Sequence, residues 1–266
     1  MNRRPVTGMA IAVALALGAG VGGAAWRSRN AGTDLPPPRI LPDPDTATLD
    51  DLHAAYGPKF FSQAEEETLI RAFFRDRREG YFVDVGASHY EKDSTTFYLE
   101  HHLGWRGIAI DALEEFRGDY QRFRPRTRFF AFFVTNEAGH AKDFYVYTRD
   151  TRISSGRLQQ LRGLPRVKER YIKTIDVPTV TLDRLLGAEG VTKVDFMSLD
   201  IEGSEPEALQ GFDIGRYRPD LFCVETQTYT RDWLMSYFAG HGYEVIHRYR
   251  DADTVNLYFR RRTARN

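Results

Sequence analysis

The sequence predicts a doubly wound α/β domain whose mostly parallel sheet is closed by an antiparallel hairpin at its carboxyl end. Two observations lead to this prediction. Short apolar runs alternate with amphipathic segments through most of the chain, which is typical of parallel strands joined by right-handed helical crossovers. Two strand-like runs then end the chain with a three-residue link between them, and so short a link permits only an antiparallel pair.

The elements follow in a regular order. A helix is expected over 62–79, beginning with the cap residue Ser62 and placing Leu69, Ile70, Phe73 and Phe74 on one face. After it come strand 81–86, helix 94–103, strand 107–112, helix 113–123, strand 128–134, a buried strand with its loop over 194–203, helix 205–212, strand 221–226, helix 231–241 and the hairpin strands 243–250 and 254–261. This order is the strand plan of class I methyltransferases, whereas an NAD-binding domain would continue with another crossover helix.

The chain is expected to start with a segment that targets a membrane. Residues 1–30 contain an uncharged run from Val6 to Trp26, and its 21 residues would span about 31 Å as a helix, enough for the core of a bilayer. We expect a single-pass anchor with the folded domain in the cytoplasm. The alternative is a signal peptide of residues 1–25, which would export the domain.

A linker and one folded domain should follow this segment. Residues 31–50 contain five prolines, which disfavour both helix and strand. The domain is expected over 51–266. Between two predicted strands, 142–148 and 175–181, it carries an insertion at about 149–173 with eight basic and two acidic residues. This basic segment is either a lid that recognises an anionic substrate or a solvated surface.

Charge and cysteine content exclude several functions. Lysine plus arginine equals aspartate plus glutamate at 37 each, so the chain has no overall electrostatic footprint for nucleic acid. The single Cys223 excludes an internal disulfide and a cysteine-rich zinc site. The histidines have no convincing metal-ligand spacing, so we expect a site without metal.

Polar residues at the ends of the first two core strands indicate a ligand site. Asp84, Gly86 and Ala87 end the first strand, where a glycine lets backbone approach a ligand closely. Asp111 ends the second strand, where a carboxylate can bind both ribose hydroxyls of an adenosine cofactor. The alternatives are a tight turn without a ligand at Gly86 and a helix cap at Asp111.

A second pair of carboxylates follows the fourth core strand. Asp200 is a candidate general base for a substrate hydroxyl, and Glu202 is a candidate partner in catalysis. Gly203 beside them has no side chain, so the backbone there can adopt conformations that other residues avoid. The alternative for Glu202 is a charge that complements the dipole of the helix that follows.

Several of these segments together resemble the FkbM-type methyltransferases. They are FVDVGAS, STTFYLEHHLGWRGIAID, TNEAGH, TVTLDRLL, VDFMSLDIEGSEPEALQGF and LFCVE, and they run from about Phe82 to about Tyr258. The resemblance implies a Rossmann-like fold, S-adenosylmethionine as methyl donor, and O-methylation of a hydroxyl on a sugar, glycan or related metabolite. It assigns cofactor binding to Asp84, Gly86, Ala87, Asp111 and Asn136.

One departure from the family keeps a second reading open. Many relatives have a second glycine shortly after the first, and here Ser88, His89 and Tyr90 fill that turn. Together with the apolar N-terminal run, this favours as the alternative a non-catalytic, membrane-tethered binding module on a methyltransferase fold.

Overall fold

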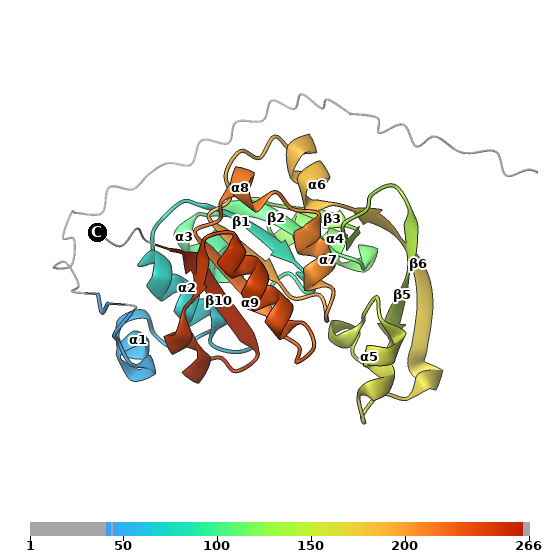
Figure 1. The fold of residues 1–266 in the computed structure, drawn as a ribbon, viewed down its shortest axis with the longest axis horizontal. Coiled ribbons are helices and arrows are strands. Elements are labelled where there is room, and N and C mark those ends of the chain that lie inside the picture. The colour runs from blue at the N-terminus through green and yellow to red at the C-terminus, as the bar shows by residue number, and fades with distance from the viewer. Residues whose placement is uncertain (1–40, 44, 263–266) are drawn as a thin grey trace, which may run out of the picture. The chain divides into compact units, whose positions relative to one another are not determined.

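A computed structural model describes residues 41–43 and 45–262 (Figure 1). Within this part of the chain, the main sheet has seven strands in the order β3-β2-β1-β7-β8-β10-β9. Its strands are β1 (Tyr81–Val85), β2 (Arg106–Asp111), β3 (Thr127–Ala131), β7 (Phe196–Leu199), β8 (Leu221–Glu225), β9 (Tyr243–Val245) and β10 (Asn256–Arg261). Five of them are parallel, and β10 is antiparallel to both β8 and β9. The predicted fold class is confirmed.

The strand order reverses at β1, which pairs with β2 on one side and with β7 on the other. From β1 the chain first builds outward to β3 and then returns to add β7 and β8 on the opposite side. In open α/β sheets such a reversal leaves a crevice at the carboxyl ends of the strands, where ligands bind. The topology therefore places the site at the ends of β1, β2 and β7.

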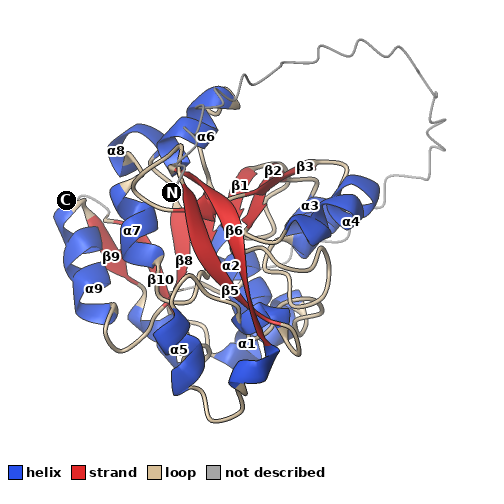
Figure 2. Cartoon of the chain, turned by 90° about the vertical axis from the view of Figure 1, so that its right-hand side faces the viewer, coloured by secondary structure: helices blue, strands red, loops and turns tan. Residues whose placement is uncertain are grey.

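Helices cover both faces of the sheet (Figure 2). Side chains of successive strand residues point to opposite faces, so Val83 and Val85 pack with the helices on one face and Phe82 with those on the other. The first face carries α6 (Leu182–Ala188), α7 (Glu205–Gln210), α8 (Ile214–Tyr217) and α9 (Arg231–Gly240), and the second carries α1 (Leu49–Tyr56), α2 (Glu66–Phe74) and α3 (Phe97–Leu103). The sheet is thus doubly wound.

The first helix begins at the end of the expected linker. A reciprocal cap starts α1, since the Thr48 hydroxyl accepts from the Asp51 N–H and the Asp51 carboxylate accepts from the Thr48 N–H. Ser62 was expected to cap the next helix. Its hydroxyl accepts from the Glu67 N–H at 3.1 Å, although the helix itself begins only at Glu66.

The insertion forms an arm that stands to one side of the main sheet (Figure 1). The two predicted strands are present as β5 (Ala141–Tyr147) and β6 (Ile172–Val180), and they pair antiparallel along their length. Among the described residues, β6 also pairs with the short β4 (Phe133–Val134), so that three strands form a second sheet. The basic segment between β5 and β6 contains the helix α5 (Leu158–Gly163).

Two predictions of strand length are wrong. The strand expected over 243–250 ends at Val245, and a 3₁₀ helix, His247–Asp251, follows it. The chain turns there because Tyr249 is buried and because the buried Asp253 carboxylate accepts from the N–H groups of Val255 and Asn256. The strands β9 and β10 still pair antiparallel, with a longer connection than expected.

The strand expected over 128–134 is two strands. The chain leaves the main sheet at Phe132, between β3 and β4, and thereby passes into the arm. The predicted membrane segment at residues 6–26 lies outside the described residues. Within the described part, no helix is long and apolar enough to cross a membrane.

Candidate active site

A cavity of about 570 Å³, its open mouth included, lies at the carboxyl ends of β1, β2 and β7. Four residues singled out in the sequence line it together: Gly86, Asp111, Asp200 and Glu202. The arm contributes the opposite wall. The other residues that line the cavity include Ile110, Leu113, Phe132, Phe133, Val134, Phe144, Arg152 and Ile201. The cavity is therefore apolar in most of its lining, with a small number of carboxylates, as is usual for a small-molecule site.

Gly86 brings the turn after β1 against the turn after β7. Its φ is +85°, and a Cβ there would lie 1.7 Å from the carbonyl oxygen of Asp200. Any side chain at this position would push the two turns apart. Gly86 was predicted to let the backbone approach a ligand. In the structure it lets two backbone turns approach each other, and it thereby fixes the position at which Asp200 leaves the sheet.

Asp111 lies on the cavity wall at the end of β2. Its two carboxylate oxygens accept from the N–H groups of Ser88 and Leu113, each at 2.9 Å. Burial raises its pKa to about 6 despite these hydrogen bonds. Each oxygen keeps a further lone pair for a ligand, so the carboxylate can still accept from two hydroxyl groups.

We expect Asp111→Ala to weaken cofactor binding by about 2–3 kcal/mol, because charge-assisted hydrogen bonds to two ribose hydroxyls are lost. Calorimetric titration with S-adenosylhomocysteine measures the change. Melting temperature is followed in parallel, since the variant also removes the acceptor of the Ser88 and Leu113 amides. Unchanged affinity in a folded variant would leave Asp111 as a cap of the turn.

Asp200 presents a carboxylate to the cavity from the end of β7. The side chain is open to the cavity, yet the protein around it displaces water and the Glu225 carboxyl lies beside it. Both causes raise the pKa of Asp200 well above its usual range. Glu225, at the end of β8, has its pKa raised to about 8 by burial and by the charges of Glu202 and Glu205. Burial and neighbouring negative charge therefore shift the carboxyls of both Asp200 and Glu225 toward higher proton affinity.

Glu202 occupies the same wall in a left-handed conformation, with φ of +54°. Gln160 from α5 donates through Nε2 to its Oε2 at 2.6 Å. Burial and the charges of Asp200 and Glu205 raise the pKa of Glu202 to about 8. Ser88 on the facing turn is also left-handed, at +49°, so two non-glycine residues with positive φ line the cavity. Such conformations are costly and concentrate at functional sites.

The turn that carries Glu202 is held from inside by Glu205. Its Oε1 accepts from the N–H groups of Ile201 and Gly203 at 3.0 and 3.1 Å, and the side chain is fully buried. Burial raises the pKa of Glu205 to about 7. This residue was expected only as the start of a helix, and its packing could not be predicted from its place in the sequence.

The carboxyl cluster predicts how stability depends on pH. Glu202, Glu205 and Glu225 have folded pKa values of about 8, 7 and 8 against 4.5 for an ordinary glutamate. Between about pH 5 and 8 the folded state therefore holds more protons than the unfolded state, and stability falls as pH rises. We expect a lower melting temperature at pH 8 than at pH 5.5. The decline should be smaller in Glu225→Gln, and a flat profile in the parent protein would contradict the raised pKa values.

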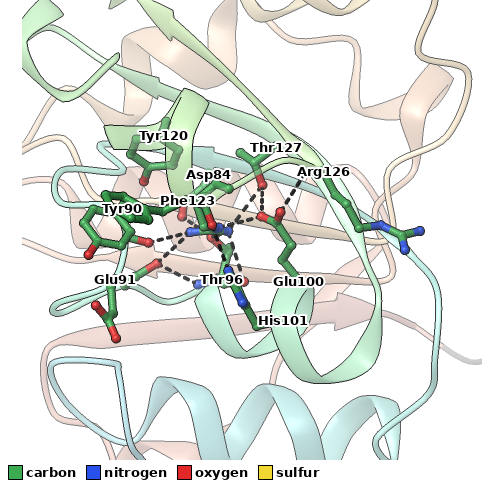
Figure 3. A network of polar contacts seen from close by, with 12 residues as sticks. Asp84, Tyr90, Glu91, Thr96, Glu100, His101, Tyr120, Phe123, Arg126 and Thr127 are labelled. Atoms are coloured by element: carbon green, nitrogen blue, oxygen red, sulfur yellow. Dashed lines mark hydrogen bonds and ion pairs between the residues drawn. The ribbon is translucent and has the colours of Figure 1, made fainter. Parts of the chain in front are cut away.

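Asp84 lies beneath the turn instead of on the cavity wall. It is buried, and its Oδ2 accepts from the Thr96 hydroxyl at 2.7 Å. Arg124, fully buried, also donates to Thr96 and forms an ion pair with Glu100 at 2.5 Å. Figure 3 shows Asp84, Thr96, Glu100 and Thr127 pointing toward one another in this network. Asp84 thus stabilises the turn after β1 through its hydrogen bond with Thr96.

The other two predicted cofactor residues also lie off the cavity wall. Ala87 is buried against Tyr120, whose hydroxyl donates to the Ala87 carbonyl at 3.2 Å. Asn136 is exposed beyond β4, and its Nδ2 donates to Gln210 Oε1 at 2.9 Å. Of the predicted cofactor residues, the structure therefore brings Gly86 and Asp111 to the cavity.

The arm supplies cavity residues that the sequence did not single out. Arg152 lines the cavity and forms ion pairs with Asp150 and with Asp93, both at 2.8 Å. Phe144 of β5 and Phe133 of β4 add aromatic walls. The basic composition of the insertion was the available signal for Arg152, whereas nothing in the sequence related the two phenylalanines to the site.

The cavity fits S-adenosylmethionine in chemistry. The cofactor joins a planar adenine and two ribose hydroxyls to a sulfonium and an ammonium group. Apolar walls from Ile110, Leu113 and Phe133 suit the base, and the Asp111 carboxylate suits the ribose hydroxyls. Within the described residues, no cluster of histidine, cysteine, aspartate or glutamate could hold a metal ion.

Comparison with known proteins identifies the family. The Methyltransferase FkbM domain matches residues 84–248, and no match was found among curated proteins. Among solved structures, the chain is similar to a 1,6-didemethyltoxoflavin-N1-methyltransferase from Burkholderia thailandensis, with bound 1,6-didemethyltoxoflavin and S-adenosylhomocysteine. The two share 14% identity over 74% of this chain and 77% of that chain, with a TM-score of 0.36. On the family match, the chain belongs to the FkbM methyltransferase family, whose members use S-adenosylmethionine as the methyl donor.

Proposed function

We propose that this protein O-methylates a hydroxyl group on a sugar, a glycan or a related metabolite, with Asp200 as the general base. The supporting observation is the position of Asp200. Its carboxylate is open to the cavity, follows the strand next to the topological switch point, and has a pKa raised by its surroundings and by Glu225. A carboxylate with a raised pKa has a higher proton affinity, so it accepts a hydroxyl proton more readily than an ordinary aspartate does.

When bound, S-adenosylmethionine supplies an electrophilic methyl group. The residues of the chain then mainly position the acceptor and manage its proton. Asp111 fixes the cofactor end of the cavity, and Asp200 accepts the proton from the acceptor hydroxyl. Phe133 and Phe144 limit the access of water, while Glu202 orients the acceptor through the wall that it shares with Asp200.

The test is methyl transfer to a panel of acceptors by the purified full-length chain. The panel contains hydroxylated sugars, lipid-linked glycans and, as controls, amines and thiols with similar scaffolds. We expect a methylated hydroxyl product, identified by mass spectrometry and NMR. Transfer to nitrogen or sulfur alone would reject the O-methylation proposal while leaving the family unchanged.

The alternative function is a non-catalytic, membrane-tethered binding module. It was suggested by the turn in which Ser88, His89 and Tyr90 replace a second glycine. The Tyr90 ring stacks on Phe123 at 4.7 Å and on His89 at 4.5 Å, so it packs away from the cavity. Cofactor binding without methyl transfer to any acceptor would favour this alternative.

We propose that residues 6–26 anchor the chain and leave the domain in the cytoplasm, where the methyl donor is made. The apolar run between Arg4 and Arg27 supports this arrangement. An alkaline phosphatase fused after Asn266 should be inactive, because that enzyme needs export to fold. An active fusion would instead support a signal peptide and an exported domain.

A further inference from the structure

An exposed tyrosine is held beside the catalytic carboxylates. Tyr229 belongs to the loop between β8 and α9, and 61% of its surface is exposed. Its hydroxyl donates to Gln160 Oε1 at 3.1 Å, and Gln160 in turn donates to Glu202 at 2.6 Å. The charges of Glu202, Glu205 and Glu225 all act on the Tyr229 hydroxyl. A short chain of hydrogen bonds therefore connects this ring to the cavity wall.

The backbone below leaves room for the tyrosine. Gly203 has a φ of +88°, and a Cβ there would lie 2.0 Å from the Tyr229 hydroxyl. The hydroxyl end of the ring is thus fixed against the turn that carries Glu202. Among the described residues, no other aromatic ring stacks on Tyr229 and no cation lies over its ring. An exposed ring that is fixed at its polar end and unstacked is ready to bind a ligand on its apolar part.

The groups around this ring match the chemistry of a pyranose. A pyranose presents C–H groups on one face and hydroxyls around its edge. The Tyr229 ring offers a flat apolar surface for that face, while the Gln160 amide and the Glu202 carboxylate offer a donor and acceptors for hydroxyls. Gln160 comes from the arm and Tyr229 from the body, so the two parts of the fold would contact the acceptor together.

We propose that Tyr229 and Gln160 form the acceptor-recognition surface of the enzyme and that they bind a pyranoside. The ring of the acceptor stacks on Tyr229, its hydroxyls contact Gln160 and Glu202, and one hydroxyl is directed toward Asp200. The proposal rests on the proposed O-methyltransferase function, and it adds the ring chemistry of the acceptor and the residues that select it.

A structural role makes a different prediction. If Gln160 and Tyr229 only hold the arm against the main domain, acceptor binding depends on the hydrogen bond of the Tyr229 hydroxyl and not on its ring. Tyr229→Phe would then behave like Tyr229→Ala. If the ring binds the acceptor, Tyr229→Phe keeps most of the affinity, whereas Tyr229→Ala loses it.

The experiment measures binding separately from turnover. Saturation-transfer NMR is recorded on the full-length chain with methyl glucopyranoside, mannopyranoside and galactopyranoside, at saturating S-adenosylhomocysteine. We expect saturation of the C–H protons on one face of at least one sugar. Titration should give a Kd that rises about 3- to 10-fold in Tyr229→Ala and stays within about twofold in Tyr229→Phe. Phe60→Ala removes another exposed aromatic ring, 66% exposed, and serves as the matched control with unchanged affinity.

The outcomes distinguish the two proposals. No saturation transfer from any pyranoside, or equal losses in Tyr229→Ala and Tyr229→Phe, would overturn the acceptor surface. Pyranoside binding that depends on the Tyr229 ring, but without any methylated product, would support this surface and reject the proposed O-methylation. Affinity for S-adenosylhomocysteine should be the same in all variants, which shows that the cofactor end of the cavity is intact.

Discussion

Asp200→Asn is expected to lower methyl transfer by about 10²–10⁴-fold, the usual contribution of a positioned general base. Asparagine keeps the size of the side chain but cannot accept the proton of the acceptor hydroxyl. Cofactor affinity should be retained, because Asp111 holds the other end of the cavity. Single-turnover transfer and calorimetric titration on the same preparation measure the two quantities.

The stability of Asp200→Asn separates catalysis from structure. The carboxyl lies beside Glu225 and near Glu66, which also raise its pKa, so removing its charge relieves repulsion in the folded state. We expect an unchanged or higher melting temperature at pH 8. A lower melting temperature together with nearly normal transfer by the folded fraction would make Asp200 a structural residue. Glu202→Gln should reduce transfer less, since Glu202 orients the acceptor and does not take its proton.

Glu100→Gln is expected to lower the free energy of unfolding by about 3–5 kcal/mol, because it leaves the buried Arg124 cation without its counter-charge. Glu100 accepts from Arg124 Nε and, through its other oxygen, from the Arg126 N–H at 2.7 Å. Burial raises the pKa of the nearby Asp84, and the Arg124 cation acts against that shift. The Asp84 carboxylate already accepts a hydrogen bond from the Thr96 hydroxyl, so it does not replace Glu100 as the partner of Arg124. The melting temperature should fall by about 6–20 °C, as measured by calorimetry.

Glu169→Gln is the control for this prediction. Glu169 also forms an ion pair with an arginine, Arg162, but both side chains are at least half exposed. Solvent screens such a pair, and its loss should cost less than about 1 kcal/mol. Equal effects of the two substitutions would mean that Arg124 finds another partner or that water reaches it.

The convergence of the site residues was predictable because it follows from topology. Parallel strands end at the same edge of a sheet, so residues that end β1, β2 and β7 must be neighbours. For this reason Gly86, Asp111 and Asp200 line one cavity although they are far apart in the chain. The parallel strands were predictable from the alternation of apolar and amphipathic segments, and the antiparallel end from the shortness of its connection.

Long-range side-chain contacts were not predictable from periodicity. Gln160 and Tyr229 are 69 residues apart, and no local pattern relates the arm to the loop before α9. The prediction of a three-residue hairpin link was wrong because the alternation of side chains in 243–250 continues past Val245. The strand nevertheless ends there, since the burial of Tyr249 and the amides bound by Asp253 set the backbone conformation that follows. Asn136 was assigned from resemblance alone, and its partner Gln210 lies on a different element.

The arm joins the rest of the fold through the short parallel pairing of β4 with β6. Its base is fixed by the pairing of Phe133 with Thr179 and of Val134 with Val180. Residues between these pairs can change in length and composition without disturbing the strands that carry Gly86 and Asp111. The contribution of the arm to the proposed acceptor surface can therefore vary while Gly86 and Asp111 stay in place. Exchanging the segment between these pairs for that of a relative should alter acceptor preference while affinity for S-adenosylhomocysteine stays the same.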